Sequence, residues 1–348
     1  SHAVESDGLR RVGIDVAAAA RVRTEGGTGH RILRLLGEGV LSTSYAQFPA
    51  PASLRAPGFV TDLIDRSRPP WYKPDVAHHV LTLDVGTSSV KAGLFSRGDG
   101  RAVWLHREPL VAEDTPDIWV TEQWVRAIQA TMNQCPRVDS LDGIALSGNG
   151  PTIVPVAEDG TPLRDALLWL DTRENRLEGQ PSFFLPKIDW YRAHEPERYE
   201  RTWQFLTCPE YLSCLMGANR HTTSPSAAFD PYVWDSAGIA SYGIRPETLP
   251  PIVRPGDQVG RVSARGAELC GVPSGVPIFA GGPDFLMSLL GTATVVPGRT
   301  CDRAGTSEGI NHCCDEATES DEVRCLPHVV PGLWNVAGVL SSTGRIFE

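Results

Sequence analysis

Residues 83–89 combine the residue types needed to hold a phosphate group and a metal ion. The segment lies between two short apolar runs, so the sequence predicts a tight turn that joins two strands. Gly86 lets the backbone approach a ligand closely, and Thr87 and Ser88 add hydroxyl donors to the exposed N–H groups. Asp84 can hold a hydrated Mg2+. The segment therefore predicts a phosphate-binding turn with a metal-binding carboxylate beside it.

A second turn of the same kind follows about two hundred residues later. Residues 303–309 are typical of a hairpin turn, in which Gly305, Thr306 and Ser307 repeat the Gly-Thr-Ser order of the first turn. Phosphoryl transfer needs fixed phosphates, an aligned acceptor and a base near the acceptor hydroxyl. The two turns therefore predict a nucleotide-dependent phosphotransferase with a cleft between two domains.

Asp284 is the candidate general base. It lies where a strand is expected to end and a helix to begin, after Gly281 and Gly282. The two glycines leave room for a substrate, and a helix start tends to keep a carboxylate ionised. Aspartate is also common as a helix N-cap, so a purely structural role stays open for Asp284.

Two segments between these motifs offer polar groups for an acceptor molecule. Asn149 and Gly150 follow an apolar strand, and Asn149 could face a polyol or simply form a turn. Asp171 and Arg173 alternate, so they share one face if a strand continues there. They either bind sugar hydroxyls or pair with one another to brace a loop. Lys91 on the second strand is expected to face solvent.

Length, composition and charge limit the function classes. The 348 residues suffice for two domains, and 41% hydrophobic with 21% charged residues is typical of a globular protein. A formal charge of −10 argues against a nucleic-acid surface, which needs clustered cations. No apolar run approaches the ~18 residues that span a bilayer. We therefore expect a soluble protein with neither nucleic-acid nor membrane partners.

The cysteines indicate a reducing compartment. Eight are scattered without a C-x-x-C pair, and no secretory signal peptide is evident, which fits a cytoplasmic protein. A zinc site is a weak alternative to buried free thiols, because structural sites usually show paired ligands at short spacing. Its candidate ligands are Cys313, Cys314, Cys325 and His328, with His312 nearby.

The composition changes near residue 80. Residues 1–79 form an N-terminal extension, with a short helix expected at 29–41 and a proline-rich linker or strap at 48–75. Residues 12–16 imitate the strand at 81–85 but lack its Gly-Thr turn. We expect a first domain over 80–297 and the start of a second domain over 298–348.

Strands come first in the expected fold, followed by a helix and then another strand. This order predicts an α/β protein with a mixed sheet rather than a plain alternation of strands and helices. The expected strands are 80–85, 89–95, 102–110, 143–146, 152–157, 276–280, 299–304, 310–313 and 333–340, and the expected helical segments are 121–135, 185–220 and 285–290.

Six segments in chain order resemble the FGGY carbohydrate kinases, the family that contains xylulokinase and glycerol kinase. Each motif is modest alone, but six in the same order are specific, and together they cover about residues 80–348. The segments are 83–91, 169–173, 187–190 with 195–197, 211–212 with 217, 281–284 and 305–307.

The resemblance implies an actin-like ATPase (ribonuclease H-like) fold and MgATP as the phosphate donor. It implies transfer of the γ-phosphate to a hydroxyl of a sugar, such as a pentulose, or of a polyol. Asp284 resembles the catalytic base of the family. Asp84 with residues 86–88 resembles the first phosphate loop, and residues 305–307 resemble the second.

Three features depart from the family pattern. Residues 148–151 read Gly-Asn-Gly-Pro, where xylulokinases carry Gln-Met-His-Gly and glycerol kinases an Arg-Glu pair, so the acceptor stays unassigned. Residues 1–79 have no counterpart. Family members also continue well past the equivalent of residue 348, into segments that hold adenosine, so we expect an incomplete second domain.

The truncation leaves several hypotheses open. The first is a sugar kinase whose remaining domain either comes from a separate polypeptide or was removed from this chain, and a half-built second domain also predicts oligomerisation. A non-catalytic sugar-binding or regulatory remnant is the second. A chaperone-like ATPase is the third, although it has no use for Asp171 and Arg173.

Overall fold

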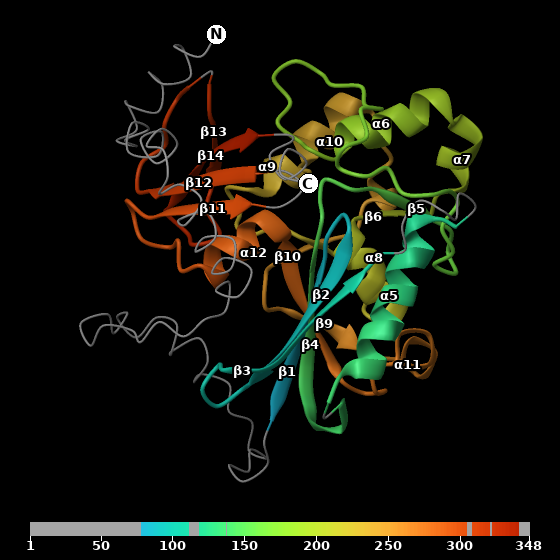
Figure 1. Cartoon of the computed structure of the whole chain (residues 1–348). Coiled ribbons are helices and arrows are strands. Elements are labelled where there is room, and N and C mark those ends of the chain that lie inside the picture. Colours follow the sequence, from blue (N-terminus) through green and yellow to red (C-terminus); the bar gives the residue numbers. More distant parts are fainter. Residues whose placement is uncertain (1–77, 111–117, 137, 305–307, 321, 341–348) are drawn as a thin grey trace, which may run out of the picture. The chain divides into compact units, whose positions relative to one another are not determined.

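The computed structural model describes residues 78–110, 118–136, 138–304, 308–320 and 322–340 (Figure 1). By its internal contacts the chain divides into one unit of residues 1–76 with 320–323 and another of residues 77–319 with 324–348. The second unit contains all features described below. Four expectations lie outside the described residues, namely the segment at 12–16, the helix at 29–41, the linker at 48–75 and the turn residues Gly305, Thr306 and Ser307.

A six-stranded mixed sheet forms the centre of the second unit. Its strand order is β3-β2-β1-β4-β10-β9, and β4 pairs parallel with both β1 and β10, whereas the other pairs are antiparallel. The mixed sheet and its opening three-strand meander confirm the expectation. The strands are β1 His79–Val85, β2 Ser89–Ser96, β3 Ala102–Pro109, β4 Leu141–Gly148, β9 Gln258–Arg261 and β10 Pro277–Pro283.

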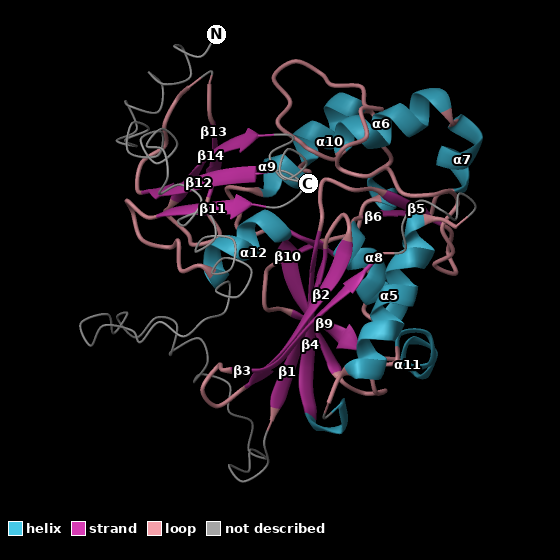
Figure 2. Cartoon of the chain, viewed as in Figure 1, coloured by secondary structure: helices cyan, strands magenta, loops and turns pink. Residues whose placement is uncertain are grey.

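Three helices cover one face of this sheet with a shared apolar core (Figures 1 and 2). They are α5 Val120–Gln134, α8 Cys208–Met216 and α11 Ala264–Cys270. In α5, Trp124, Ile128 and Met132 recur at every fourth position and are buried, as their spacing predicts. They pack with Leu81 and Leu83 of β1, so burial of this stripe fixes the helix on the sheet.

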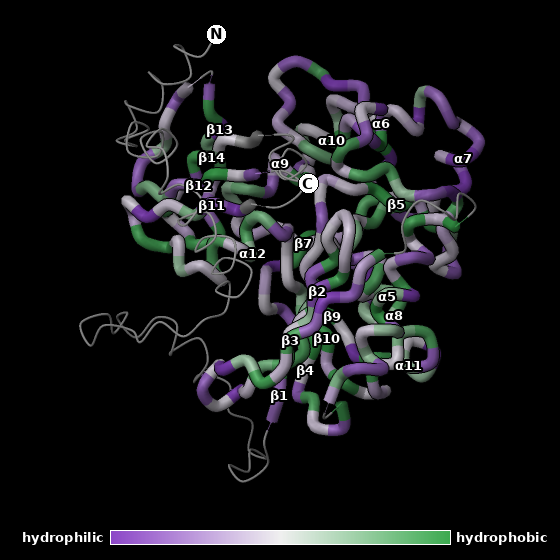
Figure 3. The backbone as a smooth tube through the Cα atoms, viewed as in Figure 1, coloured by the Kyte–Doolittle hydropathy of each residue, from purple (hydrophilic) through white to green (hydrophobic). Residues whose placement is uncertain are grey.

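A second apolar cluster gathers shorter elements around α6. The predicted helical segment at 185–220 is wrong in part, because residues 204–206 form β6, which pairs with β5 and buries Phe205. That pairing is long-range and leaves no period in the local sequence. Figure 3 shows α7 as mainly hydrophilic. The α-helices and strands between β4 and β9, other than α8, are β5 Val154–Val156, α6 Leu185–His194, α7 Pro196–Arg201, β6 Gln204–Leu206, β7 Thr222–Thr223, α9 Asp230–Val233, α10 Ser236–Tyr242 and β8 Ile252–Val253.

A four-stranded antiparallel sheet follows α12 (Asp284–Gly291). Its order is β11-β12-β14-β13, and Ala304 pairs with Glu308, so the strands on either side of residues 305–307 form the expected hairpin. Strand β13 was not predicted. Cys301 and Leu326 belong to the same buried cluster as Leu286 of α12. The strands are β11 Thr300–Ala304, β12 Glu308–Cys314, β13 Arg324–Pro327 and β14 Trp334–Leu340.

None of the helices within the described ranges has the length and apolar character needed to span a membrane.

Gly281 is required by backbone packing rather than by a substrate. The pairing of β10 with β4 shifts register between Ala280 and Gly282, and a Cβ at position 281 would lie 1.9 Å from the carbonyl oxygen of Leu146. Gly282 has a φ of +148°, a conformation that side-chain-bearing residues rarely adopt. The two glycines were expected to leave room for a substrate. In the structure they form a bulge that lets β10 approach β4 closely.

The Gly281→Ala variant should lose about 3 kcal/mol in free energy of unfolding, because its methyl group would collide with the backbone of a central strand. Gly291→Ala is the matched control, since nothing lies within 4 Å of a Cβ at position 291. Urea unfolding of both variants measures the difference. Equal stability of the two variants would contradict the packing argument.

Candidate active site

Three strand ends meet at one edge of the six-stranded sheet. Gly148, the last residue of β4, lies opposite Val85 of β1 on one side and opposite Pro283 of β10 on the other. Asp84 precedes Val85, and Asp284 follows Pro283. The parallel register therefore brings two carboxylates that are distant in sequence to the same edge, where active sites of α/β proteins are commonly found.

Asp84 carries both a cation partner and an unused oxygen. Lys91 lies opposite Asp84 in the β1–β2 pair, and its Nζ donates a hydrogen bond to Asp84 Oδ2 at 3.0 Å. The Lys91 side chain is more than half exposed, as expected, and the structure adds its pairing with Asp84. Asp84 Oδ1 is buried and accepts no hydrogen bond from the described residues.

The turn after Asp84 presents two exposed amides. The Gly86 N–H donates to the carbonyl oxygen of Ser89 at 2.9 Å, so this amide is not available to a ligand. Thr87 and Ser88 are exposed, and neither backbone N–H donates a hydrogen bond within the described residues. The carbonyl of Ser88 accepts from the N–H of Leu110 at 2.9 Å, which holds the turn against the segment after β3.

Trp169 ties a distant loop to this turn. Its Nε1 donates to Thr87 Oγ1 at 2.9 Å, so the Thr87 hydroxyl already has a donor beside it. The motif at residues 169–173 did not indicate that Trp169 contacts the first turn. The signal was its ring N–H, which can only donate and needs an acceptor when it is partly buried.

Asp284 is the first residue of α12 and is half-buried. Its Oδ1 accepts the N–H of Phe285 at 2.6 Å, so it satisfies one donor at the helix start and could still serve as a base. Burial raises the pKa of Asp284 to about 6, and the Asp84 carboxylate adds to that shift. Burial and the Asp84 carboxylate together raise the pKa of Asp284 more than the donor at the helix start lowers it.

Two cations oppose this rise in the pKa of Asp284. Arg303 of β11 has the larger lowering effect, and Lys91 has a smaller one. Arg303 belongs to the predicted turn at 303–309, two residues before Gly305, but no role beside Asp284 was predicted for it. The site therefore combines two carboxylates, Asp84 and Asp284, with two cationic side chains.

Asn149 faces the protein interior instead of a substrate. Its side chain is 3% exposed, and its amide nitrogen donates to the carbonyl oxygen of Val85 at 3.0 Å. The expectation that Asn149 faces a polyol is therefore wrong, because its polar atoms are engaged within the fold. Gly150 forms a cis peptide bond with Pro151 and has no side chain with which to bind a substrate.

Asp171 and Arg173 pair with one another in a loop. Residues 169–173 form no strand, so the argument from a shared strand face does not hold, but the pairing that braces the loop is present. Arg173 Nε and Nη2 donate to Asp171 Oδ2 at 3.1 and 2.5 Å. The hydrogen bonds from Arg173 lower the pKa of Asp171. The buried Lys187 of α6 donates its Nζ to the carbonyl oxygen of Asp171 and anchors the loop.

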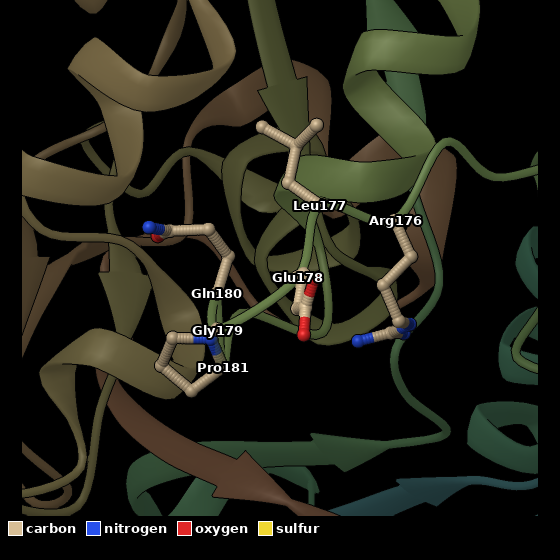
Figure 4. A pocket seen from close by; sticks show the side chains of 6 residues that line it. All are labelled: Arg176, Leu177, Glu178, Gly179, Gln180 and Pro181. Atoms are coloured by element: carbon tan, nitrogen blue, oxygen red, sulfur yellow. The ribbon is translucent and has the colours of Figure 1, made fainter.

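A depression of about 590 Å³ lies along the same loop, lined by residues 176–181 (Figure 4). It contains none of the residues predicted for catalysis or phosphate binding, and all its lining side chains come from one chain segment. We place the candidate site at the sheet edge instead, because charge and hydrogen-bonding groups converge there.

The protein's donor groups fit a metal ion held mainly by water and phosphate oxygens. Within the described ranges, no three His, Cys, Asp or Glu side chains are arranged to hold a metal together, and the eight cysteines are free. Asp84 offers one buried oxygen that lacks a donor. Magnesium typically uses one or two carboxylates and completes its octahedron with water and substrate oxygens.

The raised pKa of Asp284 predicts a pH-dependent stability. Well below pH 4 the carboxyl is neutral in both the folded and unfolded states; as the pH rises from about 4 to about 6 it ionises in the unfolded state first, so stability falls, and the loss is complete above about pH 6. Asp284→Asn should therefore gain up to about 3 kcal/mol relative to the wild type between pH 4 and pH 8. Urea unfolding at both pH values measures this difference. A pH-independent difference would show that the carboxyl is not destabilised by its surroundings.

Comparisons with known proteins identify relatives of this chain. The chain is 30% identical to the xylulose kinase of Bacillus subtilis over 278 residues, which are 70% of this chain and 55% of that protein. It is 25% identical to an autoinducer-2 kinase of Escherichia coli (strain SMS-3-5 / SECEC), covering 77% of this chain and 57% of that protein. The chain thus spans little more than half the length of these curated relatives.

Solved structures show the same fold. The xylulose kinase from Rhodospirillum rubrum superimposes with a TM-score of 0.65 at 21% identity, covering 77% of this chain and 62% of that one. Plasmodium falciparum glycerol kinase with ADP gives a TM-score of 0.61 at 14% identity, with 78% and 62% covered. The expected actin-like ATPase fold is therefore confirmed.

The family model supplies the remaining comparison. The N-terminal domain model of the FGGY family of carbohydrate kinases matches residues 79–177 and 174–291. These ranges contain Asp84, Asp284 and the loop with Asp171 and Arg173. Together they make up more than half of the sequence, so the chain belongs to the FGGY family of carbohydrate kinases.

Proposed function

We propose that this chain supplies the acceptor site, the base and the first phosphate turn of an ATP-dependent carbohydrate kinase. The reaction transfers the γ-phosphate of ATP to a hydroxyl of a sugar or polyol, and the xylulose kinase relatives favour a ketose such as a pentulose. The observation that carries the proposal is the convergence of Asp84, Lys91, Asp284 and Arg303 beside the exposed amides of the turn.

Asp284 acts as the general base in this proposal. A carboxylate with a pKa of about 6 is ionised at neutral pH and accepts a proton better than an ordinary aspartate does. The attacking hydroxyl oxygen forms a bond to the γ-phosphorus while the bond to the ADP oxygen breaks, and the hydroxyl proton moves to Asp284. A positioned base of this kind is typically worth about 10^2 to 10^4 in rate.

The backbone of the first turn holds phosphate oxygens. The N–H groups of Thr87 and Ser88, which donate to no group in the described part of the chain, provide two donors at fixed positions, as in other backbone anion sites. Asp84, whose Oδ1 lacks a donor among the described residues, would hold a hydrated Mg2+, which would supply positive charge beside the phosphates. Gly305, Thr306 and Ser307 supply the second phosphate loop.

The acceptor lies near the loop at 169–173. Trp169 links that loop to Thr87. The Arg173 side chain is 41% exposed, and its ion pair with Asp171 holds it in place. Asp171 and Arg173 are therefore the proposed sugar contacts on this side. The domain division at residue 297 is part of the same proposal.

The test follows phosphate transfer and sugar binding separately. The full chain is incubated with MgATP and a panel of pentuloses, hexuloses and polyols, alone and with a polypeptide that supplies the remaining length of its relatives. We expect transfer in the combined sample and a loss of about 10^2 to 10^4 in rate for Asp284→Ala. Asp315→Ala, which changes an exposed carboxylate outside the site, is the matched control and should keep full activity.

Sugar affinities, measured by calorimetry, separate the alternatives. Equal sugar binding by the wild type and Asp284→Ala, with no transfer in any combination, would instead favour a non-catalytic sugar-binding protein. Neither binding nor transfer for any acceptor would refute the proposed function.

A further inference from the structure

Asn149 makes three hydrogen bonds to the chain at the end of β1. Its backbone N–H donates to the Val85 carbonyl oxygen at 2.9 Å, and its side-chain Nδ2 donates to the same oxygen at 3.0 Å. Nδ2 also donates to the carbonyl oxygen of Gly86 at 3.4 Å. The side chain of Asn149, the residue directly after β4, thus binds the carbonyl oxygens of two successive residues, Val85 and Gly86.

The orientation of the Asn149 amide is fixed from its other end. Thr152 Oγ1 donates to Asn149 Oδ1 at 2.6 Å, so the amide must direct its NH2 group at the two carbonyls. Cys208 Sγ lies 3.8 Å from Nδ2, and a Cβ on Gly148 would lie 3.1 Å from the same sulfur. Close packing on this side leaves the amide no room to rotate away.

Peptide planarity carries this constraint to the ligand side. The carbonyl of Gly86 and the N–H of Thr87 belong to one planar trans peptide, so they point in opposite directions. A Gly86 oxygen held toward buried Asn149 directs the Thr87 N–H outward. That N–H is one of the two amides in the turn without a partner in the described part of the chain.

We propose that Asn149 is a positioning residue that aims the Thr87 amide at a phosphate oxygen. The inference rests on the proposed function, because that function places phosphate at this turn. It assigns Asn149 to the nucleotide side of the site rather than to the acceptor.

Asn149→Asp tests the role with almost no change in shape. The carboxylate can still accept from Thr152, but it replaces the NH2 donor with an oxygen that faces two carbonyls. The matched control is Asn335→Asp, which makes the same change at another fully buried asparagine, bonded to Asn311 in the four-stranded sheet. Thr152→Val is a milder second variant that removes only the hydroxyl fixing the amide.

The first measurement is calorimetric binding of magnesium tripolyphosphate to the full chain. Asn149→Asp should bind at least about 10-fold more weakly than the wild type, and Thr152→Val should shift in the same direction. Asn335→Asp should retain the wild-type affinity. Equal affinity losses in Asn149→Asp and Asn335→Asp would overturn the proposal, because general destabilisation would then explain both.

The second measurement is amide hydrogen exchange over residues 85–89. Exchange of the Gly86 amide, which is bonded to Ser89, should accelerate in Asn149→Asp and remain unchanged in Asn335→Asp. Unchanged exchange in both variants would overturn the role of Asn149. If the wild type binds no tripolyphosphate, the proposed phosphate site fails, while the exchange data still decide whether Asn149 holds the turn.

Discussion

The parallel pairing of β4 with both β1 and β10 is the constraint on which the rest of the site depends. Val85, Gly148 and Pro283 lie in one row across the three strands, although about two hundred residues separate the first from the last. This row places the phosphate turn, the Asn149 turn and the start of α12 side by side. Any change of register in one of these pairs would separate Asp84 from Asp284.

Placing the carboxylates of Asp84 and Asp284 at the same sheet edge costs electrostatic free energy, and the nearby cations offset only part of that cost. Burial and the neighbouring Asp84 carboxylate both raise the pKa of Asp284, so two ionised acids at this edge repel one another. Lys91 and Arg303 reduce the repulsion, yet Lys91 is exposed and screened by solvent. A divalent cation at Asp84 would relieve the repulsion further and lower the pKa of Asp284. In the proposed reaction, metal binding at Asp84 would therefore favour the ionised form of Asp284, which is the form that accepts a proton.

Sequence patterns predicted the elements whose signals are local. The meander at 80–110 has alternating apolar residues and glycine turns, and the helix at 121–135 has a four-residue apolar spacing. The strand-to-helix junction before Asp284 was also visible, because glycines and an apolar run mark it. Strand β6 was not predictable in the same way, since three residues gain their conformation only from pairing with β5.

Side-chain direction was the part of the site that sequence could not supply. Asn149 looked available for a substrate because its partners, the carbonyls of Val85 and Gly86, are more than sixty residues away. Trp169 had no visible role for the same reason, as Thr87 is 82 residues distant. Arg303 acts on Asp284 only through the fold. Long-range contacts of this kind leave no period or spacing in the chain.

The inward Asn149 also changes how the acceptor side must be built. Gly150 and Pro151, which follow Asn149, offer no side-chain donor to an acceptor. Hydroxyl recognition in the proposed site must then come mainly from the loop at 169–173. The bidentate pair of Asp171 and Arg173 and the anchor from Lys187 hold that loop in one conformation before any ligand binds. A preformed loop loses less conformational entropy on binding, so rigidity on this side favours binding of the proposed acceptor.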